Sequence, residues 1–327
     1  MSNQSRARII TALFFSCLPY RRKFLHFIKE KNKTISITEN PWETNQNLLK
    51  YFFRSFVIEY AKEKTLSYFQ KKSFNFDFVI LWGDESYPQY LKEIYDPPVV
   101  LFCKSTKKQE IDLNRFDSIS LVGTRKPYSL SLLAVDRIVE LFRISKSSKN
   151  LIHNLSDFKE NSKDLFESFF SRNLSEKEQN PKELATISGF AKGIDFRVHK
   201  ASIFFEIPTI GVLGSGIDCI SPKSSEVLFQ EAQEKNQTFI LVSEFFPTYK
   251  AGKYTFPLRN RIIAGMSLYL FLIQAGKKSG ALISVDYALQ ENRDVFVFDH
   301  KRFRQLGGNE GGEELLQQGA NLIVLPI

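Results

Sequence analysis

The chain has 327 residues, of which 43% are hydrophobic and 25% are charged. This composition supplies enough apolar side chains for one large domain plus a small one and argues against global disorder. The net charge is +9, and the whole excess lies in residues 1–75, which hold 14 basic and 5 acidic side chains, whereas residues 76–327 hold 31 of each. A basic surface attracts polyanions, usually nucleic acid and less often anionic membrane, but charge alone equally fits a solvated lysine-rich surface.

The first part of the chain has the spacing of amphipathic helices. Between residues 1 and 72, apolar side chains recur three and four positions apart. Residues 9–18 also resemble a weak signal peptide, but three basic residues follow at 21–23 without a small-residue cleavage site, so we do not expect secretion. We predict a small, basic, helical N-terminal domain over residues 1–75, with its boundary near Lys71–Ser73.

From residue 76 short apolar runs alternate with helical stretches. The predicted strands are Phe78–Trp82, Ile119–Gly123, Ala185–Ser188, Thr209–Leu213, Phe239–Ser243, Leu268–Ile273, Val295–Phe298 and Leu322–Leu325. The predicted helices are Leu130–Phe142, Ile194–Phe205, Ser224–Glu234, Ser279–Gln290 and Glu313–Gln318. This alternation is typical of an α/β domain with a doubly wound, mainly parallel sheet, here over residues 76–327. Residues 143–184 break the pattern and are predicted to be a surface insertion.

The cysteines and apolar runs indicate where the chain resides. The three cysteines (Cys17, Cys103 and Cys219) are far apart and form no CxxC pair, which fits neither a disulfide framework nor a zinc site. No apolar run approaches the roughly 20 residues that span a bilayer. We expect a cytoplasmic protein without a membrane segment.

Small and cationic residues follow several predicted strands. Because ligands bind beyond the carboxyl ends of the strands in a doubly wound sheet, these turns are the candidate site. Glycines let the backbone approach a ligand, and a helix N-terminus offers free N–H groups to a phosphate. Several such turns on one edge favour an extended polyanion over a mononucleotide. The candidate phosphate-binding residues are Gly123, Thr124, Arg125, Lys126, Ser188, Gly189, Lys192, Gly193, Gly214, Ser215, Gly216, Arg259, Asn260, Arg261, Lys278, Ser279 and Gly280.

Each of these residues also has a structural interpretation. A GSG sequence is more often an ordinary tight turn, and Arg125 could pair with Asp195. Arg259 and Arg261 could form internal ion pairs with Glu244 instead of meeting a ligand. Aromatic residues such as Tyr128, Phe190 and Phe245 could stack on bases, although core packing is the commoner role for phenylalanine in a chain with 31 of them.

The sequence provides little support for catalysis. None of the four histidines has metal-ligand spacing to another, and the chain has no GxSxG elbow, no Walker A motif and no GxGxxG. Asp195 and Glu244 could form a carboxylate pair in the cleft, but pairing of each with a neighbouring base is favoured. We predict no catalytic residues, no metal and no cofactor.

The motifs resemble the DNA-processing protein family DprA/Smf. The matching segments are YP at 87–88 with Leu91 and Ile94, DPPVVLF at 96–102, VGTRKP at 122–127, SGFAKGID at 188–195 with His199, GVLGSGID at 211–218, SEFFP at 243–247, FPLRNRIIAG at 256–265, SGALIS at 279–284 and NRDVFVFD at 292–299. The resemblance covers roughly residues 85–327, and the pair SGxAKGID with FPxRNRII is highly specific. Departures are Tyr128–Leu130 after the GTRKP turn, where the family commonly has a glycine, and Asp299-His300 in place of Pro-Gly.

The resemblance implies an extended Rossmann-like domain that binds single-stranded DNA, forms a homodimer and helps load the RecA recombinase during natural transformation. It also implies a DNA pocket that includes Arg125, Lys192, the GSG turn and the two arginines of RNR. Two alternatives remain. The first is a nucleotide-processing hydrolase on a related fold that uses Asp195 or Glu244, and the second is an interaction protein that has lost DNA binding.

Overall fold

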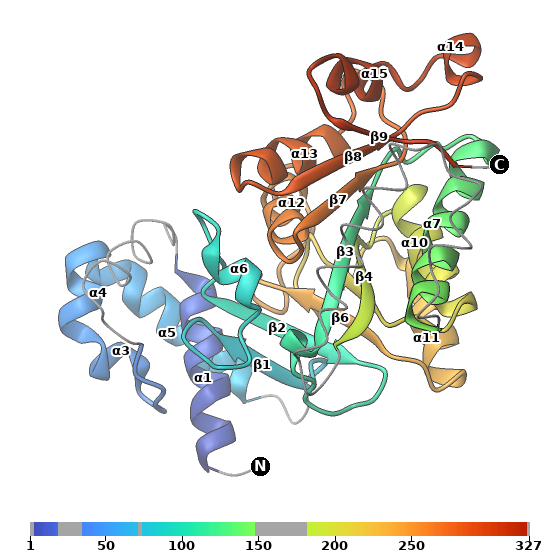
Figure 1. Ribbon diagram of the computed structural model, residues 1–327. Coiled ribbons are helices and arrows are strands. Elements are labelled where there is room, and N and C mark those ends of the chain that lie inside the picture. The colour runs from blue at the N-terminus through green and yellow to red at the C-terminus, as the bar shows by residue number, and fades with distance from the viewer. Residues whose placement is uncertain (1–2, 19–34, 71–73, 148–181, 326–327) are drawn as a thin grey trace.

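A mixed nine-stranded sheet is the centre of the fold (Figure 1). The computed structural model describes residues 3–18, 35–70, 74–147 and 182–325. The strands are β1 Phe78–Leu81, β2 Val100–Ser105, β3 Phe116–Val122, β4 Glu183–Gly189, β5 Thr209–Val212, β6 Phe239–Ser243, β7 Tyr269–Leu272, β8 Asp294–Phe298 and β9 Asn321–Ile323. The helices are α1 Asn3–Cys17, α3 Pro41–Thr44, α4 Gln46–Phe52, α5 Ser55–Phe69, α6 Gln89–Glu93, α7 Ser129–Ser147, α10 Ile194–Phe204, α11 Glu226–Glu234, α12 Thr255–Gly265, α13 Ala281–Gln290, α14 Phe303–Leu306 and α15 Glu310–Gln317.

The order of the strands defines where the sheet changes direction. The order is β1-β2-β6-β5-β4-β3-β7-β8-β9, in which β3 to β9 are parallel and β1 and β2 are antiparallel to their neighbours. The chain first winds outward from β3 to β6 and then returns to pair β7 with the other side of β3. This reversal is a topological switch point, the place where open α/β sheets leave a crevice beyond the strand ends.

Two helical layers cover the sheet because its strands alternate their side chains between faces. In β7, Leu270 and Leu272 face the cluster formed with α6, α12 and α13, whereas Tyr269 and Phe271 face the cluster formed with α7 and α10. Both layers are visible in Figure 1, with α12 and α13 on one side of β3 and β7 and with α7 and α10 on the other. The sheet is therefore buried on both faces, as the continuous apolar runs predicted.

The N-terminal helix α1 packs directly on the sheet. It lies against β1 and β2, and its apolar segment, including Leu13 and Phe14, is fully buried (Figure 1). Arg8 ties it to β1 through an ion pair with Asp84 and a hydrogen bond of 3.2 Å to the carbonyl of Val79. The segment that resembled a weak signal peptide is thus part of the core. The division of the chain at residue 75 stays a prediction.

The structure confirms the α/β sheet and all eight predicted strands, with ends that differ by three residues at most and with both ends of β6 as predicted. Strand β2 and the helices α6, α12 and α14 were not predicted. The sequence of α12 was grouped with the candidate turns, although its Pro257 lies in the first helical turn, where proline is tolerated. Residues 148–181 of the predicted insertion lie outside the described residues. Among the described helices, none has the length and apolar composition that a bilayer crossing needs.

Candidate functional site

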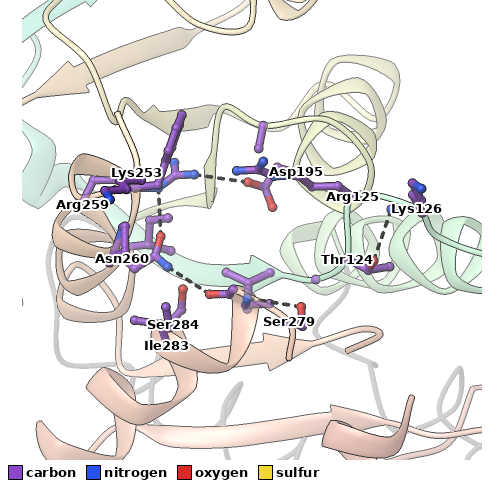
Figure 2. A pocket seen from close by; sticks show the side chains of 18 residues that line it. Thr124, Arg125, Lys126, Asp195, Lys253, Arg259, Asn260, Ser279, Ile283 and Ser284 are labelled. Atoms are coloured by element: carbon purple, nitrogen blue, oxygen red, sulfur yellow. Dashed lines mark hydrogen bonds and ion pairs between the residues drawn. The ribbon is translucent and has the colours of Figure 1, made fainter. Parts of the chain in front are cut away.

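A cavity of about 520 Å³ lies at the switch point, between the end of β3 and the N-terminal ends of α12 and α13. Figure 2 shows its side chains converging from these elements and from the start of α10. The cavity is lined by Val122, Gly123, Thr124, Arg125, Lys126, Ala191, Asp195, Lys253, Phe256, Pro257, Arg259, Asn260, Ile263, Ser279, Gly280, Ala281, Ile283 and Ser284. It therefore brings together eight of the seventeen residues expected from the sequence, drawn from three separate motifs.

One wall of the cavity is formed where the turn after β3 meets the start of α10. Gly193 has φ of +80° and caps α10, and a Cβ at this position would lie 2.6 Å from Cα of Arg125. The amide of Ile194 donates to the carbonyl of Thr124 at 3.1 Å. Residue 193 must therefore be glycine, because both its left-handed backbone and the close approach of the β3 turn exclude a side chain.

Arg259 of α12 lies buried behind the cavity and is held by three groups. Its Nε donates to Oδ1 of Asn260 at 2.9 Å, its Nη1 donates to the carbonyl of Val212, and its Nη2 lies 3.7 Å from Oδ2 of Asp195 (Figure 2). A carboxylate at 3.7 Å compensates its charge only in part. The guanidinium is thus a fixed cation whose field reaches the cavity.

Asp195, at the start of α10, is the acidic residue that lines the cavity. Burial raises the pKa of its carboxyl from 3.8 to about 6, and the charges of Arg259 and Arg125 and a hydrogen bond from the Ala191 amide oppose that rise. One turn further along α10, burial lowers the pKa of His199 to about 3, so this imidazole is neutral at ordinary pH. The carboxyl of Asp195 changes its charge close to neutral pH.

The other three cationic side chains of the cavity are exposed. Arg125 lies with its guanidinium carbon 5.3 Å from the centroid of the Phe256 ring, and Lys126 and Lys253 stand at the rim. Together with Arg259, the cavity has four cationic residues against one carboxyl group. Such a surplus attracts an anion, and exposed side chains can reach it without a large desolvation cost.

The floor of the cavity is the start of α13. The side-chain amide of Asn260 donates to the carbonyl of Gly280 at 3.2 Å, and Oγ of Ser279 accepts from the amide of Ala281 at 3.3 Å. Asn260 therefore links α12 to α13 while also accepting from Arg259. The first turn of α13 directs its N-terminal end toward the cavity, where the helix dipole favours negative charge.

Arg261 is not directed into the cavity. Its side chain is buried, with both Nη atoms paired to Glu244 at 2.8 and 2.9 Å and Nε at 3.2 Å from Asp96. Burial lowers the pKa of this guanidinium, but the charges of Glu244 and Asp96 and their hydrogen bonds outweigh burial and raise it above its ordinary value. The suggested internal pairing is thus confirmed for Arg261 with Glu244, while Arg259 pairs with Asp195, so the two acids do not form a carboxylate pair.

The remaining predicted residues lie outside the cavity lining. The amide of Gly216 is used internally by the carbonyl of Tyr249 at 2.7 Å, and Oγ of Ser188 donates to the carbonyl of Leu121 at 2.7 Å. Lys192 and Lys278 are exposed beside the cavity. The predicted residues that do not line it are Ser188, Gly189, Lys192, Gly193, Gly214, Ser215, Gly216, Arg261, Lys278 and, by their internal packing, the aromatic candidates Phe190 and Phe245.

Sequence reasoning missed Lys253 and Phe256. Lys253 stands in the turn before α12, and Phe256 carries the ring under Arg125. The sequence did contain a signal for Lys253. This lysine directly follows a glycine just before the FPLRNR motif, and glycine next to a cationic residue is also found in the other candidate turns. In the described part of the chain, no group of His, Cys, Asp and Glu could hold a metal ion.

A family model described as DNA recombination-mediator protein A matches residues 78–147 and 160–326. The chain belongs to this family, DprA. The DNA processing protein DprA of Bacillus subtilis is 33% identical over 241 residues, which are 74% of this chain and 66% of that protein. The DprA of Streptococcus pneumoniae is 30% identical over 240 residues, 73% of this chain and 68% of that protein. The matched region therefore spans about two thirds of these DprA proteins.

Solved DprA structures share the fold. The X-ray structure of DprA from Streptococcus pneumoniae has a TM-score of 0.68 and 26% identity, covering 99% of this chain and 95% of that one. DprA from Helicobacter pylori, whose structure describes a single-stranded-DNA binding mode, has a TM-score of 0.53 and 21% identity, covering 74% and 90%. The first match includes the N-terminal helices as well as the sheet.

Proposed function

We propose that this DprA protein binds single-stranded DNA with its cavity and passes it to the RecA recombinase. The observation that supports the proposal is the cavity itself, where Arg125, Lys126, Lys253 and Arg259 meet the start of α13 with only Asp195 in opposition. Phosphates are the anions that such a combination of cations, amides and hydroxyls recognises.

The ligand we propose is a strand and not a mononucleotide. Lys192 and Lys278 are exposed and are chain neighbours of the cavity residues Ala191 and Ser279, so the cationic surface extends beyond what one phosphate needs. The cavity is partly open to solvent, which allows a chain to pass through it. Contacts of this kind bind the sugar-phosphate backbone without reading sequence.

Competition titrations test the proposal. A fluorescent oligo-dT is titrated with the protein, and binding is then challenged with unlabelled single-stranded DNA, double-stranded DNA of equal length and deoxythymidine monophosphate. We expect the single strand to compete best and the mononucleotide to compete only at far higher concentration. Equal competition by the mononucleotide would show that the cavity takes one nucleotide and would overturn the strand proposal.

RecA delivery and dimerisation are separate parts of the proposal and rest on the family. A strand-exchange assay in which RecA must displace a single-strand-binding protein measures delivery, because a mediator shortens the lag before exchange. Light scattering of the purified chain measures its mass in solution, and we expect twice the monomer mass. A monomer mass at all concentrations would rule out the homodimer.

One observation favours a second candidate, a nucleotide-processing hydrolase. A buried carboxyl with a pKa of about 6 in a cavity is a feature of general acids and bases. Incubation of the protein with nucleoside monophosphates, followed by chromatography for released base, decides between the two. Release of base that is abolished in Asp195→Asn would establish the hydrolase.

A further inference from the structure

One face of α5 carries two exposed aromatic side chains and a half-buried lysine. Phe56, Tyr60 and Lys64 follow one another at intervals of four residues and therefore share a face of the helix. The Tyr60 side chain is 57% exposed, and Nζ of Lys64 lies 5.7 Å from the centroid of its ring. An exposed ring beside an ammonium group is the pairing that holds a base and the neighbouring phosphate of a single strand.

The same lysine joins α5 to the end of the sheet where the cavity lies, beyond the carboxyl ends of the parallel strands. Its Nζ also lies 4.4 Å from the centroid of Phe246, a residue in the turn that follows β6. One turn further along α5, Tyr68 contacts Phe246 at a centroid distance of 5.2 Å and donates to Asp218 at 2.9 Å. The α5 face is thus fixed against the end of β6.

The segment after β6 then leads from α5 to the cavity. Its exposed aromatic and cationic residues are Tyr249, Lys250, Lys253 and Tyr254. The ring of Tyr249 stacks on Phe245 with centroids 5.5 Å apart, and Lys253 lines the cavity at the other end of the segment. In the sheet, β6 lies three strands from β3. At the ordinary spacing between strands, the ends of β6 and β3 are therefore roughly 14 Å apart.

The two acids of α5 balance its two lysines, so the helix itself has no net charge. Glu59 lies 3.4 Å from Lys62, and Glu63 is the other acid of the helix. The segment after β6 adds two lysines and no acid between residues 247 and 254. The charge of the whole path from α5 to the cavity is therefore positive, which suits a polyanion better than a second protein surface.

We propose that a single strand bound in the cavity continues along the segment after β6 and onto α5, where Tyr60 stacks on a base and Lys64 contacts a phosphate. This inference rests on the proposed function, and it assigns a second DNA contact to the helical region that precedes the sheet. A long strand engages both contacts at once, whereas a short strand fills the cavity alone. The second contact thus raises affinity only for long strands.

A double variant, Tyr60→Ala with Lys64→Ala, separates the two contacts. It is titrated with oligo-dT of about 6 and about 20 nucleotides, lengths near the lower and upper ends of ordinary site sizes. We expect the long oligonucleotide to bind about tenfold more weakly than to wild type, since one stacked base alone is worth roughly 5- to 150-fold. Binding of the short oligonucleotide should not change.

A matched control comes from α10. Lys200 and Phe204 form an exposed lysine–aromatic pair with the same spacing of four residues, and Phe204 is 73% exposed. Along the axis of α10, Lys200 lies roughly 8 Å and Phe204 roughly 14 Å from Asp195, away from the helix end that borders the cavity. The variant Lys200→Ala with Phe204→Ala should bind both oligonucleotides as wild type does.

Three outcomes overturn the inference. The first is that the double variant binds the long oligonucleotide as wild type does, and the second is that it loses equal affinity for both lengths. The third is that its mass by light scattering changes while its DNA binding does not, which would make α5 a contact between copies. The conservative variant Tyr60→Phe with Lys64→Arg should bind like wild type, and iodouracil-labelled long oligonucleotide should crosslink to the α5 peptide. Failure of the proposed function gives a different result, because the wild type would then not bind the short oligonucleotide.

Discussion

The guanidinium of Arg259 lies directly against the backbone of Gly189, where β4 ends and the turn toward α10 begins. A Cβ at residue 189 would fall inside the contact distance of Cζ and both Nη atoms. The glycine of the SGFAKGID motif thus provides the space into which the arginine of the FPLRNR motif packs. Two motifs that are 70 positions apart in the sequence meet at this contact.

This packing predicts a large effect of one methyl group. Gly189→Ala should displace Arg259 from Val212 and Asp195, lower the free energy of unfolding by about 1–3 kcal/mol and weaken oligo-dT binding. Urea unfolding and fluorescence titration measure the two effects. The control is Gly252→Ala, where a Cβ would have no neighbour within 4 Å, so stability should change by less than about 0.5 kcal/mol. Wild-type stability in Gly189→Ala would contradict the packing.

Arg125 should account for one phosphate contact. Its side chain is exposed above Phe256, so Arg125→Ala removes a cation without burying an unpaired group. Affinity for oligo-dT should fall about tenfold, and the log-log salt slope should become shallower by about 0.7. Titration at several salt concentrations measures both values, with Lys200→Ala as a control that removes an exposed cation from α10. An unchanged slope would place the phosphate elsewhere.

The strands and the turns of the site could be predicted from the sequence, whereas the partners of individual buried side chains could not. Runs of consecutive apolar residues identified the parallel strands, because a strand buried on both faces has apolar side chains at every position. In β7, for example, Leu270 and Phe271 point to opposite layers. The turns of the candidate site followed from the rule that ligands bind beyond the strand ends. Arg261 shows what the pattern could not provide. Its neighbours Glu244 and Asp96 come from distant parts of the chain, and sequence spacing contains no information on which arginine they bind.

The pKa of Asp195 predicts a dependence of DNA binding on pH. With a pKa of about 6, the carboxyl is ionised at pH 7 and neutral at pH 5, and its loss of charge leaves Arg259 uncompensated. Affinity for oligo-dT should therefore rise about threefold to tenfold as pH falls from about 7 to about 5. Asp195→Asn should bind at pH 7 as wild type does at pH 5 and should lose this dependence.

Stability should change in the same pH range. Because the folded pKa of Asp195 lies above its ordinary value of 3.8, the folded state holds the proton more tightly than the unfolded state. This residue therefore lowers the free energy of unfolding as pH rises from about 4 to about 6. Urea unfolding of wild type and Asp195→Asn at both pH values measures the difference. A parallel pH dependence in the two proteins would contradict the shifted pKa.

Arg261 should matter for folding and not for direct DNA contact. It is buried between Glu244 and Asp96, so Arg261→Met leaves two buried carboxyl groups without their cation and should lower the free energy of unfolding by about 3–5 kcal/mol. Arg115→Ala is the matched control, because it breaks an arginine–glutamate pair in which the arginine side chain is 56% exposed, and it should cost less than about 1 kcal/mol. Urea unfolding measures both variants. If Arg261→Met were as stable as wild type but unable to bind oligo-dT, the arginine would be a DNA contact after all, as the RNR motif first suggested.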